Sequence, residues 1–238
     1  MMSDRGAQRS SLSIIVPTYN EAENIGELIE RIETSLKGLD FEVIVVDDSS
    51  PDGTAEIAEE LGRAYRNVKV IKRPRKMGLA SAALEGMREA KYRLIAVMDA
   101  DLQHPPELLP KLLERAKEGY DIVIASRYVK GGGVEGWSLW RRLISRGATL
   151  LAHALFLETR KVKDPLSGFF LFRREVVEGI RLNPIGYKLL LEVLMKGEYD
   201  KVAEVPYVFK MRRRGKSKLD LREILNYVLF LLKLKRQK

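Results

Sequence analysis

The sequence predicts an α/β fold with a mostly parallel central sheet, and two features of its pattern support this. In the first half of the chain, short apolar runs rich in valine and isoleucine alternate with segments whose apolar residues recur at helical spacing. The runs are apolar without interruption, which is typical of strands buried on both faces. Alternating strands and helices of this kind favour a parallel sheet covered by helices on both sides. A chain of 238 residues is long enough to bury one sizeable core.

The predicted elements follow in regular order up to residue 128. We expect strands over 12–19, 41–48, 68–73, 93–101 and 121–128. We expect helices over 20–36, 55–65, 77–90 and 105–119. Thr54 is expected to cap the second helix, and Pro105 and Pro106 suit the first turn of the fourth.

The pattern changes after Tyr128, where glycine becomes frequent and the apolar segments lengthen. In order, we expect a flexible loop over 130–136, a helix over 137–157, a turn with a short strand over 163–177, a helix around 188–195, a strand over 201–214 that runs into a basic loop, and a closing helix. The chain is therefore expected to divide into a polar tail over 1–11, one folded domain over 12–218 and a basic amphipathic helix over 219–238.

The amino-acid composition argues against several types of metal site and catalytic nucleophile. The chain has no cysteine, which excludes disulfides, thiolate metal sites and cysteine nucleophiles. Because only two histidines are present, His104 and His153, a histidine zinc site or a Ser-His-Asp triad has little to draw on. Any bound metal is therefore expected to be a hard cation held by oxygen.

The net charge of +9 is matched by an excess near the C-terminus. Residues 205–238 hold eleven Lys and Arg against Asp220 and Glu223, an excess equal to that of the whole chain. Such a segment is expected to meet phosphates, nucleic acid or a membrane surface. The first residues are polar and unlike a signal peptide, and no apolar run reaches the roughly 18 residues of a membrane span.

Polar residues follow four of the predicted strands at the point where each strand ends. Residues 17–21 (PTYNE) follow the first strand, Asp47 and Asp48 the second, 99–101 (DAD) the fourth and Arg127 the fifth. Ligands of parallel sheets bind beyond the carboxyl ends of the strands, so we expect these residues to converge on one site.

Asp99, Asp101 and Gln103 offer several oxygen ligands within five residues. Mg²⁺ and Mn²⁺ prefer such ligands, typically one or two carboxylates together with substrate phosphates. The alternative is an acidic turn that binds no ion. Asp47 and Asp48 could likewise bond a ribose or a base, or be solvated strand ends.

A glycine-rich phosphate cradle is missing, since neither G-x-G-x-x-G nor G-x-x-x-x-G-K-[ST] occurs. Any bound phosphate is therefore expected to be held by metal and by basic side chains. The candidates are Arg127, Arg141, Arg142, Arg146, Arg212, Arg213, Arg214, Lys216 and Lys218. Gly215 and Ser217 suit a mobile loop that closes over a ligand, although a solvated basic face would have the same composition.

Segment 137–157 combines both tryptophans of the chain with arginines and a following apolar run. Tryptophan and arginine at the edge of an apolar surface are typical of a helix that lies in a membrane interface. The alternative is a core helix with a basic outer face. The closing helix repeats the combination with Tyr227, Phe230 and four basic residues after Leu232, so peripheral membrane contact is expected through 137–157 and 219–238.

Six motifs, taken in order, resemble glycosyltransferase family 2, and within it the dolichol-phosphate mannose synthases. They are PTYNE, VVDDSSPDGT, DADLQHPPE, SRYVKGGG, DPLSGFF and RRRGKSKL, and they run from about Leu12 to Leu219. The resemblance implies a GT-A (Rossmann-like) catalytic domain over 12–218, a GDP-mannose donor, Mn²⁺ or Mg²⁺, and a polyprenyl (dolichyl) phosphate acceptor. It implies an inverting transfer at the cytoplasmic face of a membrane, with a membrane subunit as a further partner and no nucleic acid. Several members continue into transmembrane helices, whereas this sequence ends after one amphipathic helix.

The resemblance also implies roles for residues at matching positions. The guanosine would be held by Pro17, Tyr19, Glu21, Val46 and Asp48. The metal and the donor diphosphate would be held by Asp99, Ala100, Asp101 and Gln103, with Asp99, Asp101 and Gln103 as the metal ligands. The acceptor phosphate would meet Arg127, Arg141 and Ser145, while Arg212, Lys218 and Lys188 would reach the donor. Asp99, Asp101 and Arg127 would be the catalytic residues.

The chemistry of the residues is consistent with this resemblance. A phosphate monoester is mostly dianionic at neutral pH, with a second pKa of about 6, so it can attack a sugar without an enzymatic base. Such a reaction needs cations that bring two anionic phosphates together. Three rival hypotheses are a UDP-glucose-dependent dolichyl-phosphate glucosyltransferase of the same fold, a phosphatase with an aspartyl nucleophile, and a non-enzymatic module that binds membrane surfaces or nucleic acid.

Overall fold

The central sheet has seven strands in the order β3-β2-β1-β4-β7-β5-β8. In this computed structural model, residues 11–184, 188–210 and 221–236 are described, with the backbone alone described for 221–226. The strands are β1 (Leu12–Thr18), β2 (Phe41–Asp47), β3 (Val68–Lys72), β4 (Leu94–Val97), β5 (Ile122–Ser126), β7 (Phe170–Arg173) and β8 (Val202–Pro206). Every neighbouring pair is parallel except those of β7, which runs antiparallel to both β4 and β5. The mostly parallel sheet is confirmed.

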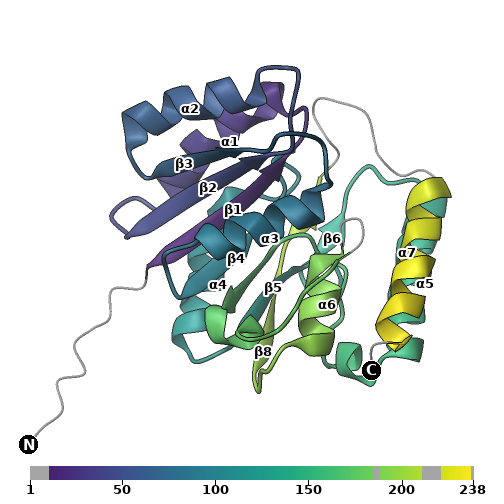
Figure 1. The fold of residues 1–238 in the computed structure, drawn as a ribbon. Helices are drawn as coiled ribbons and strands as arrows, with labels where there is room; N and C mark the ends of the chain where they lie inside the picture. Colours follow the sequence, from purple (N-terminus) through teal and green to yellow (C-terminus); the bar gives the residue numbers. More distant parts are fainter. Residues whose placement is uncertain (1–10, 185–187, 211–220, 237–238) are drawn as a thin grey trace, which may run out of the picture.

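Helices cover both faces of this sheet (Figure 1). The helices are α1 (Ala22–Ser35), α2 (Thr54–Tyr65), α3 (Leu79–Glu89), α4 (Leu109–Lys117), α5 (Leu139–Leu155), α6 (Leu189–Lys196) and α7 (Leu221–Arg236). Three short 3-10 turns, η1 (Pro106–Leu108), η2 (Leu157–Lys161) and η3 (Arg174–Val177), and a small sheet of β6 (Gly133–Val134) with β9 (Val208–Phe209) complete the structure.

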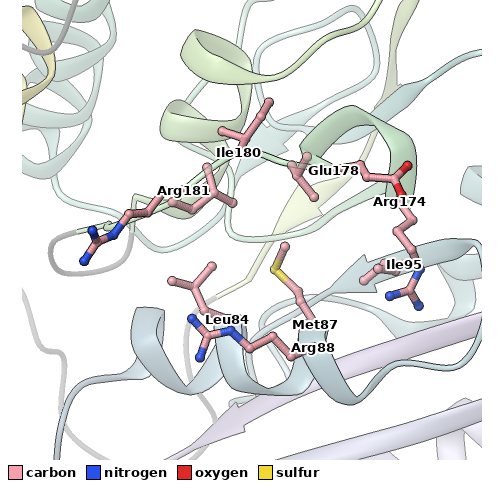
Figure 2. A pocket seen from close by; sticks show the side chains of 10 residues that line it. Leu84, Met87, Arg88, Ile95, Arg174, Glu178, Ile180 and Arg181 are labelled. Atoms are coloured by element: carbon pink, nitrogen blue, oxygen red, sulfur yellow. The ribbon is translucent and has the colours of Figure 1, made fainter.

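One face of the sheet packs against α3 and α6. Successive residues of β1 point to opposite faces, and Ile15 lies on this one beside Ala82 and Ala83 of α3. Next to this core a pocket of about 300 Å³ lies between α3 and the segment after β7 (Figure 2). Its lining includes Leu84, Met87, Arg88, Ile95, Arg174 and Arg181. This pocket does not include any of the predicted site residues.

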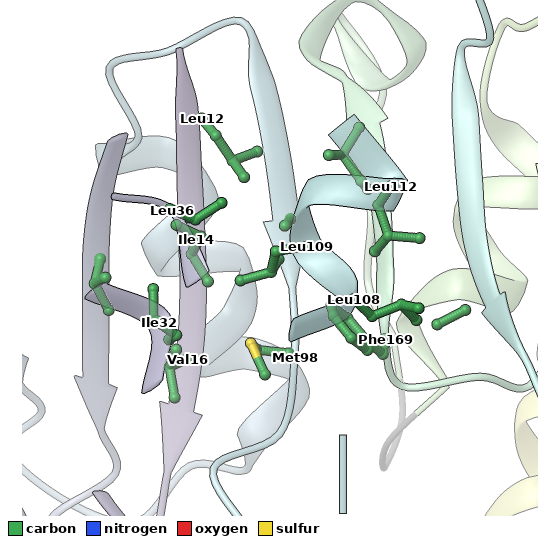
Figure 3. Packing of buried hydrophobic residues seen from close by; sticks show 14 of the residues in the cluster. Leu12, Ile14, Val16, Ile32, Leu36, Met98, Leu108, Leu109, Leu112 and Phe169 are labelled. Atoms are coloured by element: carbon green, nitrogen blue, oxygen red, sulfur yellow. The ribbon is translucent and has the colours of Figure 1, made fainter. Parts of the chain in front are cut away.

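The other face packs against α1, α2 and α4. Ile14 and Val16 of β1 meet apolar side chains from these helices, among them Ile32 of α1 and Leu109 of α4 (Figure 3). All seven residues of β1 and all seven of β2 are buried, which accounts for their mainly apolar sequence. Their polar residues Ser13 and Glu42 are paired with each other by a hydrogen bond of 2.6 Å. The two cores together fix the sheet and therefore the positions of its strand ends.

A third cluster joins α7 to α5 at the end of the molecule away from β3 (Figure 1). Phe230 and Leu231 of α7 pack with Ala152 of α5, and the Tyr227 hydroxyl donates to the Ala148 carbonyl at 2.7 Å. Within the described part of the chain, no helix is long and apolar enough to cross a membrane. The helices expected over 137–157 and 219–238 thus correspond to α5 and α7, which pack against each other.

Several predicted boundaries were wrong, each for a local reason. The strand expected over 93–101 stops at Val97, and the chain then turns through Leu102, which has a positive φ of 59°. The strand expected over 201–214 breaks at Tyr207 into β8 and β9, which belong to different sheets. The loop expected over 130–136 contains β6. The short strand expected over 163–177 is confirmed as β7, which lies between β4 and β5 in the main sheet.

Two helix starts also differ from the prediction. Asn20 has a positive φ of 58°, so α1 begins at Ala22 rather than at Asn20. Thr54 does not cap α2 but is its first residue. Its hydroxyl donates to Asp52 at 2.5 Å and accepts the Glu21 N–H at 2.9 Å. Thr54 therefore links the end of β1 to the start of α2.

A glycine pair tests how tightly α3 packs on the sheet. A Cβ at Gly86 would lie 2.5 Å from Ile15 Cγ2 and 3.0 Å from Val46 Cγ2, whereas one at Gly147 in α5 would have open space. Gly86→Ala should lower the free energy of unfolding by about 1–2 kcal/mol, because overpacking outweighs the gain in helix propensity. Gly147→Ala should raise it by up to about 1 kcal/mol. Urea unfolding of both variants measures this, and equal stabilisation would contradict the packing described.

Candidate active site

Four parallel strands end at one edge of the sheet, where the predicted site residues are found. Residues 19–21 follow β1, Asp47 and Asp48 end β2, Asp99 and Asp101 follow β4, and Arg127 follows β5. Because β7 is antiparallel, its amino end lies at this same edge, so the segment 162–169 before it enters the site. The sequence pattern did not reveal this contribution.

The two carboxylates after β4 have different surroundings. The Asp99 side chain is 39% exposed, whereas Asp101 is buried and accepts the Gln103 N–H at 3.1 Å. The Gln103 amide nitrogen donates to the Lys210 carbonyl at 2.6 Å, so the amide oxygen is the Gln103 atom that suits a metal. One open and one buried carboxylate thus share a single turn.

This turn fits a hard divalent ion that shares its ligands with a substrate. Among the residues described, no three or more His, Asp or Glu side chains cluster in a way that could enclose a metal. Mg²⁺ and Mn²⁺ do not need such a cluster, because one or two carboxylates with phosphate and water oxygens are enough. The donor set of Asp99, Asp101 and Gln103 is of this kind.

Asp48 is held by donors of the chain itself. Its carboxylate is buried and accepts from Arg73 Nη1 at 2.8 Å, from the Met77 N–H at 2.8 Å and from the Gly78 N–H at 2.6 Å. Asp48 therefore anchors the loop that leads into α3. That loop places the Lys76 ammonium 3.6 Å from the centre of the Tyr19 ring. Arg73 was not predicted as a site residue, although its place at the end of the strand expected over 68–73 is a signal that points to it.

The other residues expected at the nucleotide lie around this anchor. Pro17 and Val46 are paired in the sheet, and the Val46 side chain belongs to the core under α3, so Val46 can meet a ligand only through its backbone. Glu21 is buried and accepts from Asn24 Nδ2 at 2.8 Å. Asp47 accepts from the Thr18 hydroxyl at 3.0 Å and from the Ser50 hydroxyl at 2.5 Å.

Arg127 is held through its side chain and its backbone by the buried carboxylate of Asp164. Its Nε donates to Asp164 Oδ2 at 2.8 Å, its Nη2 to Oδ1 at 2.7 Å, and its backbone N–H to Oδ2 at 3.0 Å. Burial alone would lower the pKa of Arg127, but the hydrogen bonds and charge of Asp164 outweigh it and raise the pKa above its ordinary value. Arg127 therefore stays charged at any pH at which the protein is folded.

Arginines and aromatic rings alternate around Arg127. Its guanidinium lies 5.2 Å from the Tyr128 ring and 5.8 Å from the Trp137 ring. The same two rings also meet other arginines, since Arg141 lies 4.5 Å from Trp137 and Arg146 lies 4.6 Å from Tyr128. We call these five residues the arginine–aromatic group. Rings at these distances stabilise neighbouring cations and hold them apart from one another.

The residues predicted for the acceptor phosphate meet at this group. Ser145 of α5 shares a hydrogen bond of 2.7 Å with the Tyr128 hydroxyl, one turn after Arg141. Trp137 packs against Phe209 at 5.3 Å between ring centres, so of the two tryptophans only Trp140, at 76% exposed, faces outward. Trp137 is half-buried, so the interface contact expected for 137–157 stays a prediction, and Trp140 is the tryptophan exposed enough to make it.

The remaining predicted residues fall elsewhere. Lys188 precedes α6, and its ammonium lies 5.8 Å from the Tyr227 ring of α7. Arg212, Lys218 and the other basic residues of 211–220 lie outside the described residues.

Comparison with known proteins now identifies the family. The model of glycosyl transferase family 2 matches residues 13–181. The chain belongs to glycosyl transferase family 2. Within this family it is 54% identical over 217 residues to a Pyrococcus furiosus protein named dolichol-phosphate mannosyltransferase, covering 91% of this chain and 61% of that protein. It is 37% identical to the Saccharomyces cerevisiae protein of the same name, covering 91% of this chain and 84% of that protein.

Solved structures support the fold of this family member. Glucosyl-3-phosphoglycerate synthase from Mycobacterium tuberculosis, solved with Mn²⁺, UDP-glucose and phosphoglyceric acid, matches with a TM-score of 0.71. The match covers 95% of this chain and 80% of that one at 24% identity. The GT-A-like α/β fold expected from the sequence is confirmed.

The ion pair between Arg127 and Asp164 gives the second prediction. Asp164→Asn leaves a buried guanidinium without a countercharge, so the free energy of unfolding should fall by about 3–5 kcal/mol. Glu175→Gln removes the carboxylate of an exposed pair with Arg93 and should cost about 0–1 kcal/mol. Denaturant unfolding of the two variants measures the difference. Equal effects would contradict the buried ion pair described for Arg127 and Asp164.

Proposed function

We propose that this chain transfers mannose from GDP-mannose to the phosphate of a polyprenyl (dolichyl) phosphate, with inversion at the sugar. The observation that carries the proposal is one strand edge that joins an acidic turn to the charged arginine–aromatic group. Relatives named dolichol-phosphate mannosyltransferase, similar along most of this chain, support mannose as the sugar and dolichyl phosphate as the acceptor.

The acidic turn would hold the donor diphosphate through Mn²⁺ or Mg²⁺. Asp99, Asp101 and the Gln103 amide oxygen are the proposed ligands, and the backbone of Ala100 passes the same point. The ion, when bound, neutralises negative charge on the departing diphosphate. The chain's own contribution is to present one solvent-facing and one buried carboxylate from a turn that is fixed by a hydrogen bond within it and by another to the Lys210 carbonyl.

The nucleoside would lie along the ends of β1 and β2. Tyr19, Glu21 and the backbone of Pro17 and Val46 line this part of the edge, above the loop that Asp48 anchors. Lys188, Arg212 and Lys218 are proposed to reach the donor from the second half of the chain. The base and ribose contacts decide between GDP-mannose and UDP-glucose, so this region sets donor choice.

The acceptor phosphate would be held by Arg127, Arg141 and Ser145. One phosphate oxygen forms a bond to the sugar C1 while the bond from C1 to the diphosphate oxygen breaks, and GDP leaves with the electron pair. A phosphate with a second pKa of about 6 is already ionised at neutral pH, so no base is required. The cations bring the two phosphates together and hold their negative charge.

The lipid part of the acceptor would lie on the outer face of α5 and α7. This face exposes large apolar side chains, namely Leu139, Trp140, Leu143, Ile144, Leu150 and Leu151 of α5, Leu157 just after it, and Val228, Leu229 and Leu232 of α7. Lys233, Lys235 and Arg236 follow in the last turn of α7. Apolar residues beside basic ones are typical of peripheral helices. We propose contact with the cytoplasmic face of a membrane, where a membrane subunit could also bind, and no role in nucleic-acid binding.

Transfer of labelled sugar tests the activity. Purified protein with dolichyl phosphate and GDP-mannose should form a labelled lipid in the presence of Mn²⁺ or Mg²⁺, and EDTA should abolish it. UDP-glucose should give a rate lower by a factor of at least about 100, since a site that bonds one base rejects another strongly. Asp101→Ala should lower the rate by a similar factor. Near wild-type activity of Asp101→Ala, or faster transfer from UDP-glucose, would refute the assignment.

Vesicle binding tests the membrane face. Leu143→Glu in α5 should weaken pelleting with vesicles that contain anionic lipid, because a charge replaces an apolar contact in the interface. Leu39→Glu, at an exposed leucine after α1, is the matched control and should leave pelleting unchanged. If both variants pellet like the wild type, α5 does not face the membrane.

A further inference from the structure

His104 binds the backbone of Asp99. The Asp99 N–H donates to His104 Nδ1 at 3.2 Å, and the imidazole is 2% exposed. The preceding amide, that of Met98, makes the last sheet hydrogen bond of this strand, to the Ile15 carbonyl at 3.1 Å. The Asp99 N–H is therefore the first amide beyond the sheet, and a histidine takes over from the neighbouring strand as its acceptor.

This hydrogen bond fixes the tautomer of the ring. Because Nδ1 accepts a hydrogen bond from the Asp99 N–H, it carries no proton of its own, and the ring proton is on Nε2. Asp99 Oδ2 lies 3.6 Å from the same nitrogen, beyond hydrogen-bond range. The ring thus binds the backbone of Asp99 and leaves its carboxylate facing the site.

The ring is itself held by aromatic neighbours. Its centre lies 5.5 Å from that of Phe169, 5.9 Å from Tyr207 and 5.7 Å from Phe209. A Cβ at Gly168 would lie 3.1 Å from His104 Cε1 and 3.0 Å from Asp99 Oδ2. A side chain at position 168 would therefore make both partners shift by a few tenths of an ångström.

Two hydrogen bonds together close the acidic turn. One joins Asp99 to His104, and the other joins the Gln103 N–H to Asp101. The turn includes Leu102 at a positive φ, a conformation that a β-carbon makes unfavourable and that the surroundings must hold. Loss of the acceptor would leave a backbone N–H without a partner and allow Asp99 to change direction.

We propose that His104 is a positioning residue for the metal-binding carboxylate of Asp99, acting through the Nδ1 acceptor. The proposal rests on the proposed function in one respect, namely that Asp99 binds a divalent ion. Residues that orient metal ligands typically change metal affinity by about 10- to 100-fold when they are replaced. His104 should belong to this group although it never touches the metal.

Two substitutions separate positioning from packing. His104→Phe keeps a ring among the aromatic neighbours and removes the acceptor. His104→Asn removes the ring and keeps an acceptor, because the asparagine oxygen takes the place of Nδ1. Mn²⁺ affinity, measured with GDP present by electron paramagnetic resonance of free Mn²⁺, should fall about 10- to 100-fold in His104→Phe and stay within about threefold in His104→Asn. Thermal stability should show the opposite order.

The opposite pattern would overturn the proposal. If Mn²⁺ affinity follows thermal stability, with His104→Phe like the wild type and His104→Asn impaired, His104 serves packing alone. Nitrogen NMR of the wild-type protein without metal gives an answer that needs no variant. Unprotonated Nδ1 coupled to the Asp99 amide supports the proposal, and protonated Nδ1 refutes it. If the wild type itself does not bind Mn²⁺ with GDP, the proposed metal site is refuted. If all three proteins bind Mn²⁺ with equal affinity, the metal site stands and only the positioning role of His104 is refuted.

Discussion

The reversed direction of β7 is the constraint on which the site depends. All other strands of the main sheet run parallel, so their carboxyl ends lie at one edge, and only a reversed strand can bring its preceding segment to that edge. The segment carries Asp164, which binds Arg127 just after β5. It also carries Gly168, where an added Cβ would lie against Asp99 and His104. The two halves of the site are thus held by one short stretch of chain between their strands.

Buried charge in this protein serves position more than stability. Asp48 with Arg73 and Asp164 with Arg127 are both almost fully buried, and such pairs often contribute little net free energy because desolvation offsets their attraction. Each pair instead fixes something that a ligand would meet. Asp48 fixes the loop under Tyr19, and Asp164 fixes the cation at the centre of the arginine–aromatic group. Replacing either partner of a pair would therefore change the geometry of the site even in protein that is still folded.

The sequence predicted the sheet and its edge because continuous apolar runs and the residues that follow them are local signals. The sequence could not predict the position of β7 in the sheet, because a strand of four residues carries no local signal for its neighbouring strands or for its direction relative to them. Asp164 and Arg73 were missed for the same reason, as their partners lie 37 and 25 residues away. Val46 is the opposite case, a residue that the family resemblance placed at the nucleotide but whose side chain lies in the core. Trp137 has the sequence surroundings of an interface residue, but in the fold its ring packs with Phe209 and lies near Arg127 and Arg141.

The central claim is that the carboxyl edge of the sheet, and not the pocket beside α3, binds metal and nucleotide. Anomalous diffraction from crystals grown with Mn²⁺ and GDP tests it most directly. The account predicts a single strong manganese peak within coordination distance, about 2.0–2.2 Å, of oxygens from Asp99 or Asp101, with the guanosine along β1 and β2. Manganese bound elsewhere, or GDP seated among Leu84, Arg88 and Arg181, would contradict it.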